Sequence, residues 1–161
     1  MRSPAASWRS GLNVVVDASA LIAAFLPREE HQAEAIALVK AHTDWRLRLR
    51  APWLLRYETA NAVLVASRRG RITDEIADRV LRDVLKLHIA RYSADPQLAL
   101  ALARQYGRSA YDASYLALAQ EQELPFVTAD RRLHDAVVGN LSWVVWIGDW
   151  QQRLPLAGTP S

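Results

Sequence analysis

The chain contains no cysteine among its 161 residues. Disulfide bonds, thiolate metal sites and thiol catalysis are therefore excluded. Histidine is scarce as well, and no two histidines are spaced four residues apart, the spacing at which a helix aims two imidazoles at one metal ion. This argues against a histidine metal site. The histidines are His31, His42, His88 and His134.

Long apolar runs are also missing. No uninterrupted apolar segment approaches the ~18 residues that would span a bilayer, and the run Val14 to Val16 is too short for a signal-peptide core. We therefore expect a cytoplasmic protein with no membrane segment.

A large charge imbalance is absent too, since the net charge is +3 from 20 basic and 17 acidic residues. The pI of about 9.6 is compatible with a nucleic-acid partner without requiring one.

What is present is the composition of a soluble globular domain, with 51% hydrophobic and 23% charged residues. The length fits one domain with its own core, which we place at residues 12–150, with flexible tails at 1–11 and 155–161. Predicted strands alternate with predicted helices, which favours a mostly parallel sheet covered by helices. The strands are expected at 13–16, 46–50, 88–92, 126–128 and 142–147, and the helices at 18–26, 29–41, 53–69, 74–87, 96–106, 110–123 and 130–138.

Four acidic residues lie at the edges of these predicted elements. Asp17 and Asp130 directly follow strands, and Glu58 and Asp112 open apolar helical stretches. The carboxyl ends of parallel strands share one edge of a sheet, where ligands bind. Two like charges ~4 Å apart repel by roughly 4 kcal/mol at an effective dielectric of ~20, so clustered carboxylates need a cation between them. Such oxygen ligands suit Mg²⁺ or Mn²⁺, which can ready a water to attack a phosphodiester.

Each acid also has an ordinary structural interpretation. Asp17 and Asp130 could simply cap the helices that follow them. Asp112 would be favoured by the dipole of its helix, and Glu58 could be an exposed helical residue. The polar neighbours that could orient these acids have the same ambiguity, and they are Ser19, Asn61 and Thr128.

Taken together, four segments resemble the PIN-domain family, most closely the VapC-type toxins of bacterial toxin–antitoxin pairs. They are VVDASAL at 15–21, ETAN at 58–61, AYDASYLALA at 110–119 and VTADRRL at 127–133. The last two segments are the most specific. The matching landmarks span most of the predicted domain.

This resemblance implies an α/β/α sandwich and Mg²⁺- or Mn²⁺-dependent endoribonuclease activity. It implies that Asp17, Glu58, Asp112 and Asp130 form a catalytic acidic pocket, in which Asp17, Asp112 and Asp130 hold the metal. The supporting residues would be Ser19, Asn61 and Thr128. The resemblance also implies a homodimer and a VapB-like antitoxin that lays an extended segment across the pocket.

Several arginines and tryptophans have two interpretations. Arg131 and Arg132 adjoin Asp130 and could contact an RNA backbone, as could Arg68 and Arg69, although charge runs are usually solvated faces. The alternating residues Arg46, Arg48 and Arg50 are expected on the wet face of an edge strand. We expect the C-terminal tryptophans Trp143, Trp146 and Trp150 to pack in the core.

Two other functions remain open from the sequence. The first is a catalytically silent PIN-fold module that binds RNA or acts as a scaffold. The second is a phosphoacceptor domain built on Asp17, which the chain disfavours because it lacks the second Asp and Thr spacing of haloacid-type phosphatases and a glycine-rich phosphate loop.

A homodimer is suggested by apolar positions on helices 29–41 and 53–69, namely Ile36, Leu38, Val39, Leu54, Leu55, Val63 and Leu64.

Overall fold

The computed structural model of the chain describes residues 11–154 and 156. The expected tails therefore lie almost entirely outside the described residues. The described residues contain a parallel five-stranded sheet in the order β3-β2-β1-β4-β5. Its strands are β1 (Leu12–Val16), β2 (Leu47–Pro52), β3 (Ala90–Tyr92), β4 (Phe126–Thr128) and β5 (Val144–Trp146).

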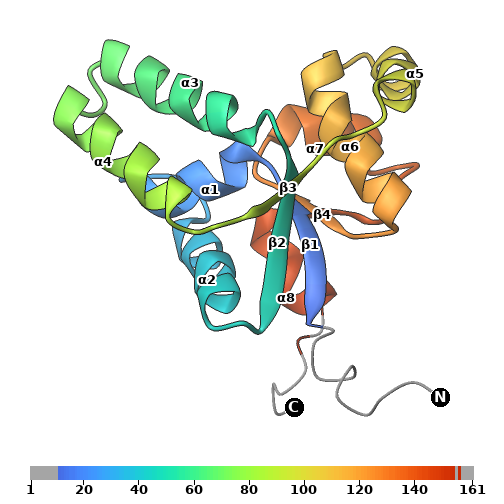
Figure 1. Cartoon of the computed structure of the whole chain (residues 1–161), viewed down its shortest axis with the longest axis horizontal. Coiled ribbons are helices and arrows are strands. Elements are labelled where there is room, and N and C mark those ends of the chain that lie inside the picture. Colours follow the sequence, from blue (N-terminus) through green and yellow to red (C-terminus); the bar gives the residue numbers. More distant parts are fainter. Residues whose placement is uncertain (1–10, 155, 157–161) are drawn as a thin grey trace.

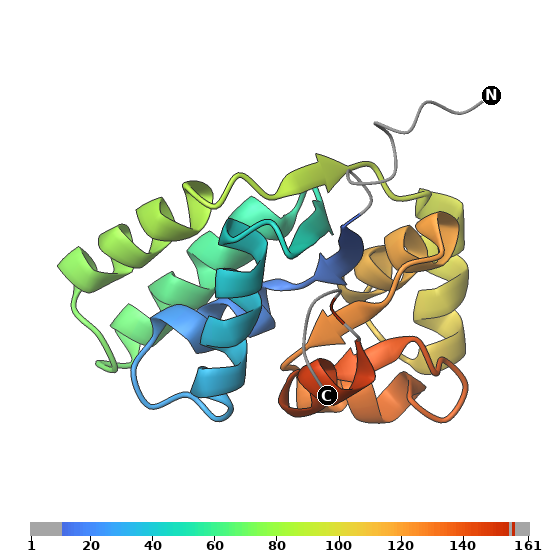
Figure 2. The same cartoon turned by 90° about the horizontal axis from the view of Figure 1, so that it is seen from below.

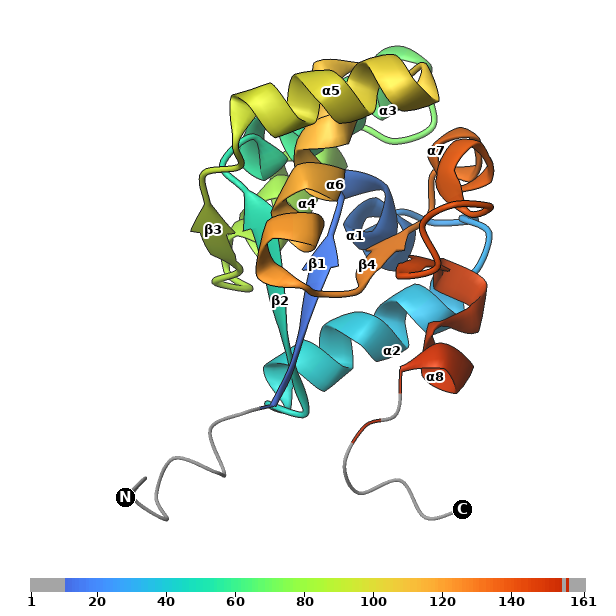
Figure 3. The same ribbon diagram turned by 90° about the vertical axis from the view of Figure 1, so that its right-hand side faces the viewer.

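Helices cover both faces of this sheet, which confirms the predicted α/β/α sandwich (Figures 1 and 2). The helices that connect β1, β2 and β3 lie on one face, and those that connect β3, β4 and β5 lie on the other. The first group is α1 (Ala18–Phe25), α2 (Gln32–Thr43), α3 (Leu55–Arg68) and α4 (Asp74–Leu85). The second is α5 (Pro96–Tyr106), α6 (Ala110–Gln122) and α7 (Arg131–Val137), with α5 packed on α6 (Figure 3).

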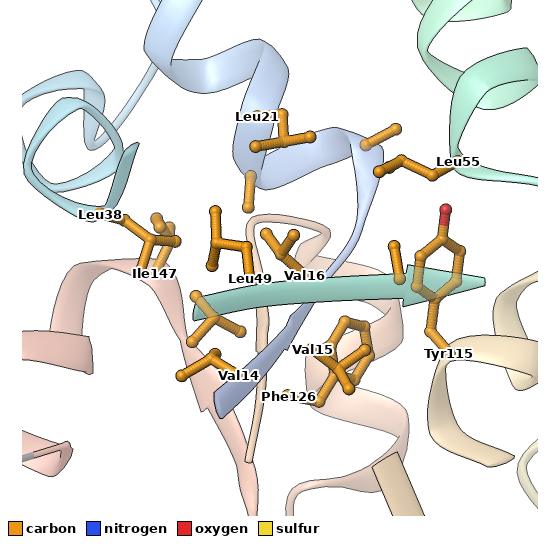
Figure 4. Packing of buried hydrophobic residues seen from close by; sticks show 14 of the residues in the cluster. Val14, Val15, Val16, Leu21, Leu38, Leu49, Leu55, Tyr115, Phe126 and Ile147 are labelled. Atoms are coloured by element: carbon orange, nitrogen blue, oxygen red, sulfur yellow. The ribbon is translucent and has the colours of Figure 1, made fainter. Parts of the chain in front are cut away.

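The hydrophobic core is centred on the middle strands of the sheet. Val14, Val15 and Val16 on β1 are fully buried, with neighbouring strands on both sides. Phe126 and Tyr115 stack beside them, their ring centroids 5.8 Å apart (Figure 4). Because the strand order reverses between β1 and β4, the carboxyl ends of these two strands form the switch point at which α/β sheets bind ligands.

Helix ends follow the sequence where the signals are local. Thr73 caps α4 through a bond from the Ile76 amide, as its position predicts. Gly107 ends α5 at a φ of 63°, and Gly70 follows α3 at a φ of 70°, both in the left-handed region that favours glycine. The expected helix and strand segments are therefore found, with boundaries that shift by a few residues.

Two expectations about individual elements were wrong, and one element was not anticipated. Helix α2 begins at Gln32 rather than residue 29, because Arg28 and His31 adopt left-handed backbone (φ 62° and 57°). Strand β2 lies between β1 and β3, so its arginines are not on an edge strand. The chain also continues past β5 into a 3-10 turn, η2 (Ile147–Asp149), and a short helix, α8 (Trp150–Arg153).

The tryptophan-rich end packs as predicted. Trp150 is 1% exposed and Trp146 7% exposed, and the indole Nε1 of Trp150 donates to the Glu34 carbonyl at 2.9 Å. This bond joins α8 to α2, so the last helix packs against the core after β5. Across the described part of the chain, no helix has both the length and the apolar character needed to cross a membrane.

Candidate active site

Asp17 lies at the switch point, directly after β1. Its carboxylate caps α1 by accepting from the Ala20 amide at 3.1 Å. Two hydroxyls complete its surroundings: Ser19 donates to Oδ1 at 2.5 Å and Thr128 donates to Oδ2. The side chain is buried, so capping is real but is only part of its environment. Burial raises the pKa of Asp17 to about 6, against the opposing effect of these hydrogen bonds.

Ser19 and Thr128 link the ends of β1 and β4 around that carboxylate. Thr128 lies beside Asp17 because Val127 pairs with Val16 in the sheet. The Ser19 hydroxyl accepts from the Ala129 amide and the Thr128 hydroxyl from the Asp130 amide, each at 3.0 Å. Both predicted supporting hydroxyls therefore lie where they can fix the orientation of Asp17.

Asp130 stands at the end of β4 and caps α7, accepting from the Leu133 amide at 3.1 Å. Its negative charge contributes to the raised pKa of Asp17. The two strand-end acids thus share one edge of the sheet, the arrangement that the strand pattern predicts. Asp130 also has the structural role expected of it, since one carboxylate can both cap a helix and contribute its charge to the site.

Glu58 reaches the site from α3 and is held by a phenol. The Tyr115 hydroxyl donates to Glu58 Oε2 at 2.8 Å. Burial raises the pKa of Glu58 to about 7, and the negative charges of Asp17, Asp112 and Asp130 raise it further. The pKa of Tyr115 is raised as well, first by its burial. Glu58 is therefore the group on which the other three acids converge electrostatically.

Asp112 occupies the first turn of α6, where Ser109 caps the helix. Its Oδ2 accepts from the Arg108 guanidinium at 3.0 Å, one helical turn before it. Asp112 is therefore the member of the acidic set with an intramolecular cation beside it. The donor types fit Mg²⁺ or Mn²⁺, since the set is made of carboxylates with supporting hydroxyl oxygens. In residues 11–154 and 156, however, no three His, Asp or Glu groups are already arranged to hold a metal ion.

A cavity of about 440 Å³ opens between α1, α3 and the end of β4. None of the four acids lines it, and Ser19, which donates to Asp17, is the residue that joins it to them. Ser19 and Asn61 line it, as do Arg69 and Arg71 from the end of α3 and the turn after it. Asn61 is exposed rather than bonded to an acid, and Arg68 and Arg132 are exposed to solvent. Of the predicted RNA-binding arginines, Arg69 lines this cavity, and Arg131 lies over the ring of Trp146, which also lines it.

Three contributors to the site were missed by sequence reasoning. Arg108 lies four residues before Asp112, a helical ion-pair spacing that could have been recognised. Tyr115 lies three residues after Asp112, so it could have been placed on the same helical face. Trp146 gave no such signal, because its contact with Arg131 joins two separate elements.

Comparisons with known proteins agree on one family. The model of the PIN domain matches residues 14–138. Ribonuclease VapC3 of Pyrobaculum aerophilum is 34% identical over 128 residues, which cover 76% of this chain and 92% of that protein. Ribonuclease VapC9 of Mycobacterium tuberculosis is 34% identical over 122 residues, which cover 76% of this chain and 89% of that protein.

A solved structure resembles the whole described fold. The crystal structure of PAE2754 from Pyrobaculum aerophilum superimposes with a TM-score of 0.66 at 29% identity, covering 89% of this chain and 96% of that one. The likeness therefore extends beyond the four short motifs to the sheet and the helices around them.

Proposed function

Because this chain belongs to the PIN-domain family, we propose that it is a metal-dependent endoribonuclease, the toxin of a toxin–antitoxin pair, acting in the cytoplasm. One observation carries the proposal. Four carboxylates from two strand ends and two helices gather at the switch point of the sheet. Beyond the effect of burial, the charges of Asp17, Asp112 and Asp130 raise the pKa of Glu58, and the charge of Asp130 raises the pKa of Asp17. Acids held together against their repulsion are what a divalent cation stabilises. Two of the relatives are named ribonucleases, which supports RNA as the substrate.

We assign the metal to Asp17, Asp112 and Asp130, with Mg²⁺ or Mn²⁺ as the ion. Such an ion supplies charge to the phosphodiester and acidity to a water molecule. Ser19 and Thr128 fix the Asp17 carboxylate through its two oxygens. Arg108 donates to one Asp112 oxygen, so a cation held by that oxygen would have to share or replace this contact.

Glu58 is the proposed proton acceptor for the attacking water. The Tyr115 hydroxyl donates to one of its two carboxylate oxygens, which leaves the other to take a proton. The charges of Asp17, Asp112 and Asp130, which raise the pKa of Glu58, favour that protonation. No covalent intermediate is needed, because the chain has no cysteine and no Ser–His pair arranged for nucleophilic attack was identified in its sequence. The products should then carry a 5′-phosphate and a 3′-hydroxyl.

We further propose that a VapB-like antitoxin inhibits the enzyme through charge. An arginine placed among the carboxylates would supply the positive charge that they lack and would displace the metal. The names of the VapC relatives support this partner, as do the negative charges of Asp17, Asp112 and Asp130 around Glu58. We also propose that the protein forms a homodimer.

The first prediction tests the activity itself. The purified protein with Mg²⁺ or Mn²⁺ should cleave a circular single-stranded RNA, which only an endonuclease can open, and EDTA should stop the reaction. Asp17→Asn, Asp112→Asn and Asp130→Asn should each lower kcat/KM at least roughly tenfold, through lost metal positioning. Asp78→Asn, at an exposed position of α4, is the matched control and should cleave like the native protein.

Two readouts separate this mechanism from its alternatives. A 2′,3′-cyclic phosphate at the new end would contradict it, because the RNA's own 2′-hydroxyl would then have attacked. Absence of cleavage with retained RNA binding would favour the catalytically silent module. In cells, expression of the native chain should arrest growth, whereas Asp112→Ala should not.

A further inference from the structure

Arg131 is held over an indole ring at the edge of the acidic site. Its guanidinium carbon lies 3.7 Å from the centroid of the Trp146 ring. The arginine side chain is 54% exposed, whereas Trp146 is 7% exposed. An exposed arginine is therefore positioned by a nearly buried aromatic side chain, which is the geometry of a cation–π contact.

The indole itself is fixed from behind. Its Nε1 donates to His31 Nε2 at 3.3 Å, and the His31 ring meets it edge-on at 5.6 Å between centroids. Gly148 leaves the room that this histidine occupies, since a Cβ there would lie 2.8 Å from His31 Cε1. His134 of α7 packs on the same indole at 5.6 Å. Trp146 is thus a rigid support and not a loosely packed ring.

This support stands next to the proposed catalytic acids. Arg131 follows Asp130 in the chain, and Trp146 shares the wall of the 440 Å³ cavity with Ser19, the residue that donates to Asp17. Arg69 and Arg71 line the same cavity. Glu29 and Glu30 line it too; Glu29 is paired with Arg71, and Glu30 lies 3.9 Å from the Arg131 guanidinium. A strand of RNA whose scissile phosphate lay at the acids would bring a neighbouring phosphate to this rim.

The stacked geometry leaves Arg131 able to bind that phosphate. Stacking uses the flat face of the guanidinium, so its N–H groups, which lie in the plane, still point outward in the fork that matches a phosphate. The carboxylate paired with Arg131 is Glu30, which is 76% exposed and 3.9 Å away. A pair so exposed and so long is weak, and a phosphate can replace it.

We propose that Arg131 binds an RNA phosphate flanking the scissile bond, and that Trp146 is the positioning residue that holds it there. This inference rests on the proposed ribonuclease function. It differs from a general basic surface because it assigns the binding to one arginine and makes that arginine dependent on one indole. Removing the indole should therefore weaken RNA binding although Trp146 carries no charge.

Kinetics with a single-stranded RNA oligonucleotide and Mg²⁺ test the assignment. Arg131→Ala should raise KM roughly tenfold and leave kcat within about twofold, because the contact is to a non-reacting phosphate. In the Asp112→Asn background without metal, fluorescence anisotropy should show the slope of log K against log salt fall by about 0.7, the value for one phosphate of a single strand. Arg79→Ala removes an equal charge from an exposed position on α4 and should change neither quantity.

The role of Trp146 needs a double-mutant cycle. Trp146→Leu should raise KM roughly three- to tenfold in the native background, and Trp146→Phe should recover most of this loss because it keeps an aromatic face. In the Arg131→Ala background, Trp146→Leu should add nothing further. An equal rise in KM in both backgrounds would mean that Trp146 only supports the fold, and would overturn its positioning role.

Failure of this inference is distinguishable from failure of the proposed function. If the native protein cleaves RNA and Arg131→Ala leaves KM and the salt slope unchanged, the phosphate assignment is wrong while the enzyme stands. If the native protein cleaves nothing but binds the oligonucleotide in an Arg131-dependent way, the enzyme is wrong while the assignment stands. Should Trp146→Leu not fold, Arg131→Ala and Trp146→Phe still decide the matter. Absence of both cleavage and binding overturns both.

Discussion

Glu58 is a carboxylate held in a partly buried site by a phenol instead of a cation. Its pKa is raised to about 7, first by burial and then by the charges of Asp17, Asp112 and Asp130. A carboxylate that ionises less readily in the folded protein than in the unfolded chain keeps its proton to higher pH. Folding is therefore favoured while Glu58 is protonated and is opposed once it ionises.

The second prediction is a fall in stability with rising pH. In EDTA, the free energy of unfolding should decrease as pH rises from about 4.5, where the unfolded chain begins to lose the proton, to about 7, where the folded protein loses it. The Glu58 contribution should be about 1–2 kcal/mol after solvent screening. Urea titrations across this range should show a flatter dependence for Glu58→Gln than for the native protein. The exposed control Glu75→Gln should keep the native slope; equal slopes for all three would contradict the prediction.

At the scale of elements, His42 joins α2 to the sheet. Its Nδ1 accepts from the Leu49 amide of β2 at 3.2 Å, and its Nε2 lies 2.8 Å from the Leu87 carbonyl before β3. These two partners fit a neutral imidazole that carries its proton on Nε2. Burial lowers the pKa of His42, so the folded protein resists the proton that the unfolded chain accepts below about pH 6.5.

The third prediction therefore has the opposite sign to the second. His42 should cost stability as pH falls below about 6.5, because protonation then favours the unfolded chain. His42→Gln should lower stability at pH 7.5 by about 1–2 kcal/mol through lost hydrogen bonds, and should lose less on acidification than the native protein. His88→Asn is the control, since that histidine is exposed with a left-handed backbone that Asn tolerates. A native-like acid dependence in His42→Gln would count against this role.

The individual helices and strands show which parts of the fold can be predicted from the sequence. Both ends of helix α5 were predicted correctly, because Pro96 and Gly107 mark the start and the end of the helix through their own backbone preferences. The start of α2 was not, because Arg28 and His31 are left-handed without being glycine, so no residue type marks the break in the sequence. The interior place of β2 depends on strand pairing, which alternating arginines do not encode.

The site divides in the same way. Asp17 and Asp130 were predicted to share an edge because parallel strands end together, and the register between Val16 and Val127 brings that about. The contact between Trp146 and Arg131 could not be predicted, since it depends on how α7 and β5 pack. The sequence therefore predicted groups whose placement follows from strand ends, but it did not predict a side-chain contact that depends on how a helix packs beside a strand.

At the scale of the whole molecule, fewer residues are available for a homodimer interface than the sequence suggested. Leu38, Leu55 and Val63 are in the core, so they are not available to a partner. Val39 and Leu54 pack against the core and are partly buried. Ile36 and Leu64 remain, at 50% and 42% exposure.

The fourth prediction concerns this assembly. The isolated protein should have the mass of a dimer by light scattering at tens of micromolar concentration. Charges introduced at the interface should dissociate it, because buried unpaired charge is costly. Leu64→Lys and Ile36→Lys test the two remaining exposed positions of the expected surface. A strictly monomeric native protein would rule the dimer out, and a dimer unaffected by both substitutions would place its interface elsewhere.

The fifth prediction treats metal binding as a property of the whole fold. An ion that binds only the folded protein stabilises it by RT ln(1 + [L]/Kd), which is ~2.7 kcal/mol at ~100 Kd. Mg²⁺ or Mn²⁺ should therefore raise the melting midpoint of the native protein and of Asp78→Asn, but much less that of Asp112→Asn. In EDTA, Asp17→Asn should melt above the native protein, because it removes a buried charge that Asp130 repels while its amide oxygen still accepts from Ser19 and Ala20. An unchanged native midpoint with either metal, or an equal rise in Asp112→Asn, would mean that the carboxylates relieve their repulsion by holding protons and not a cation.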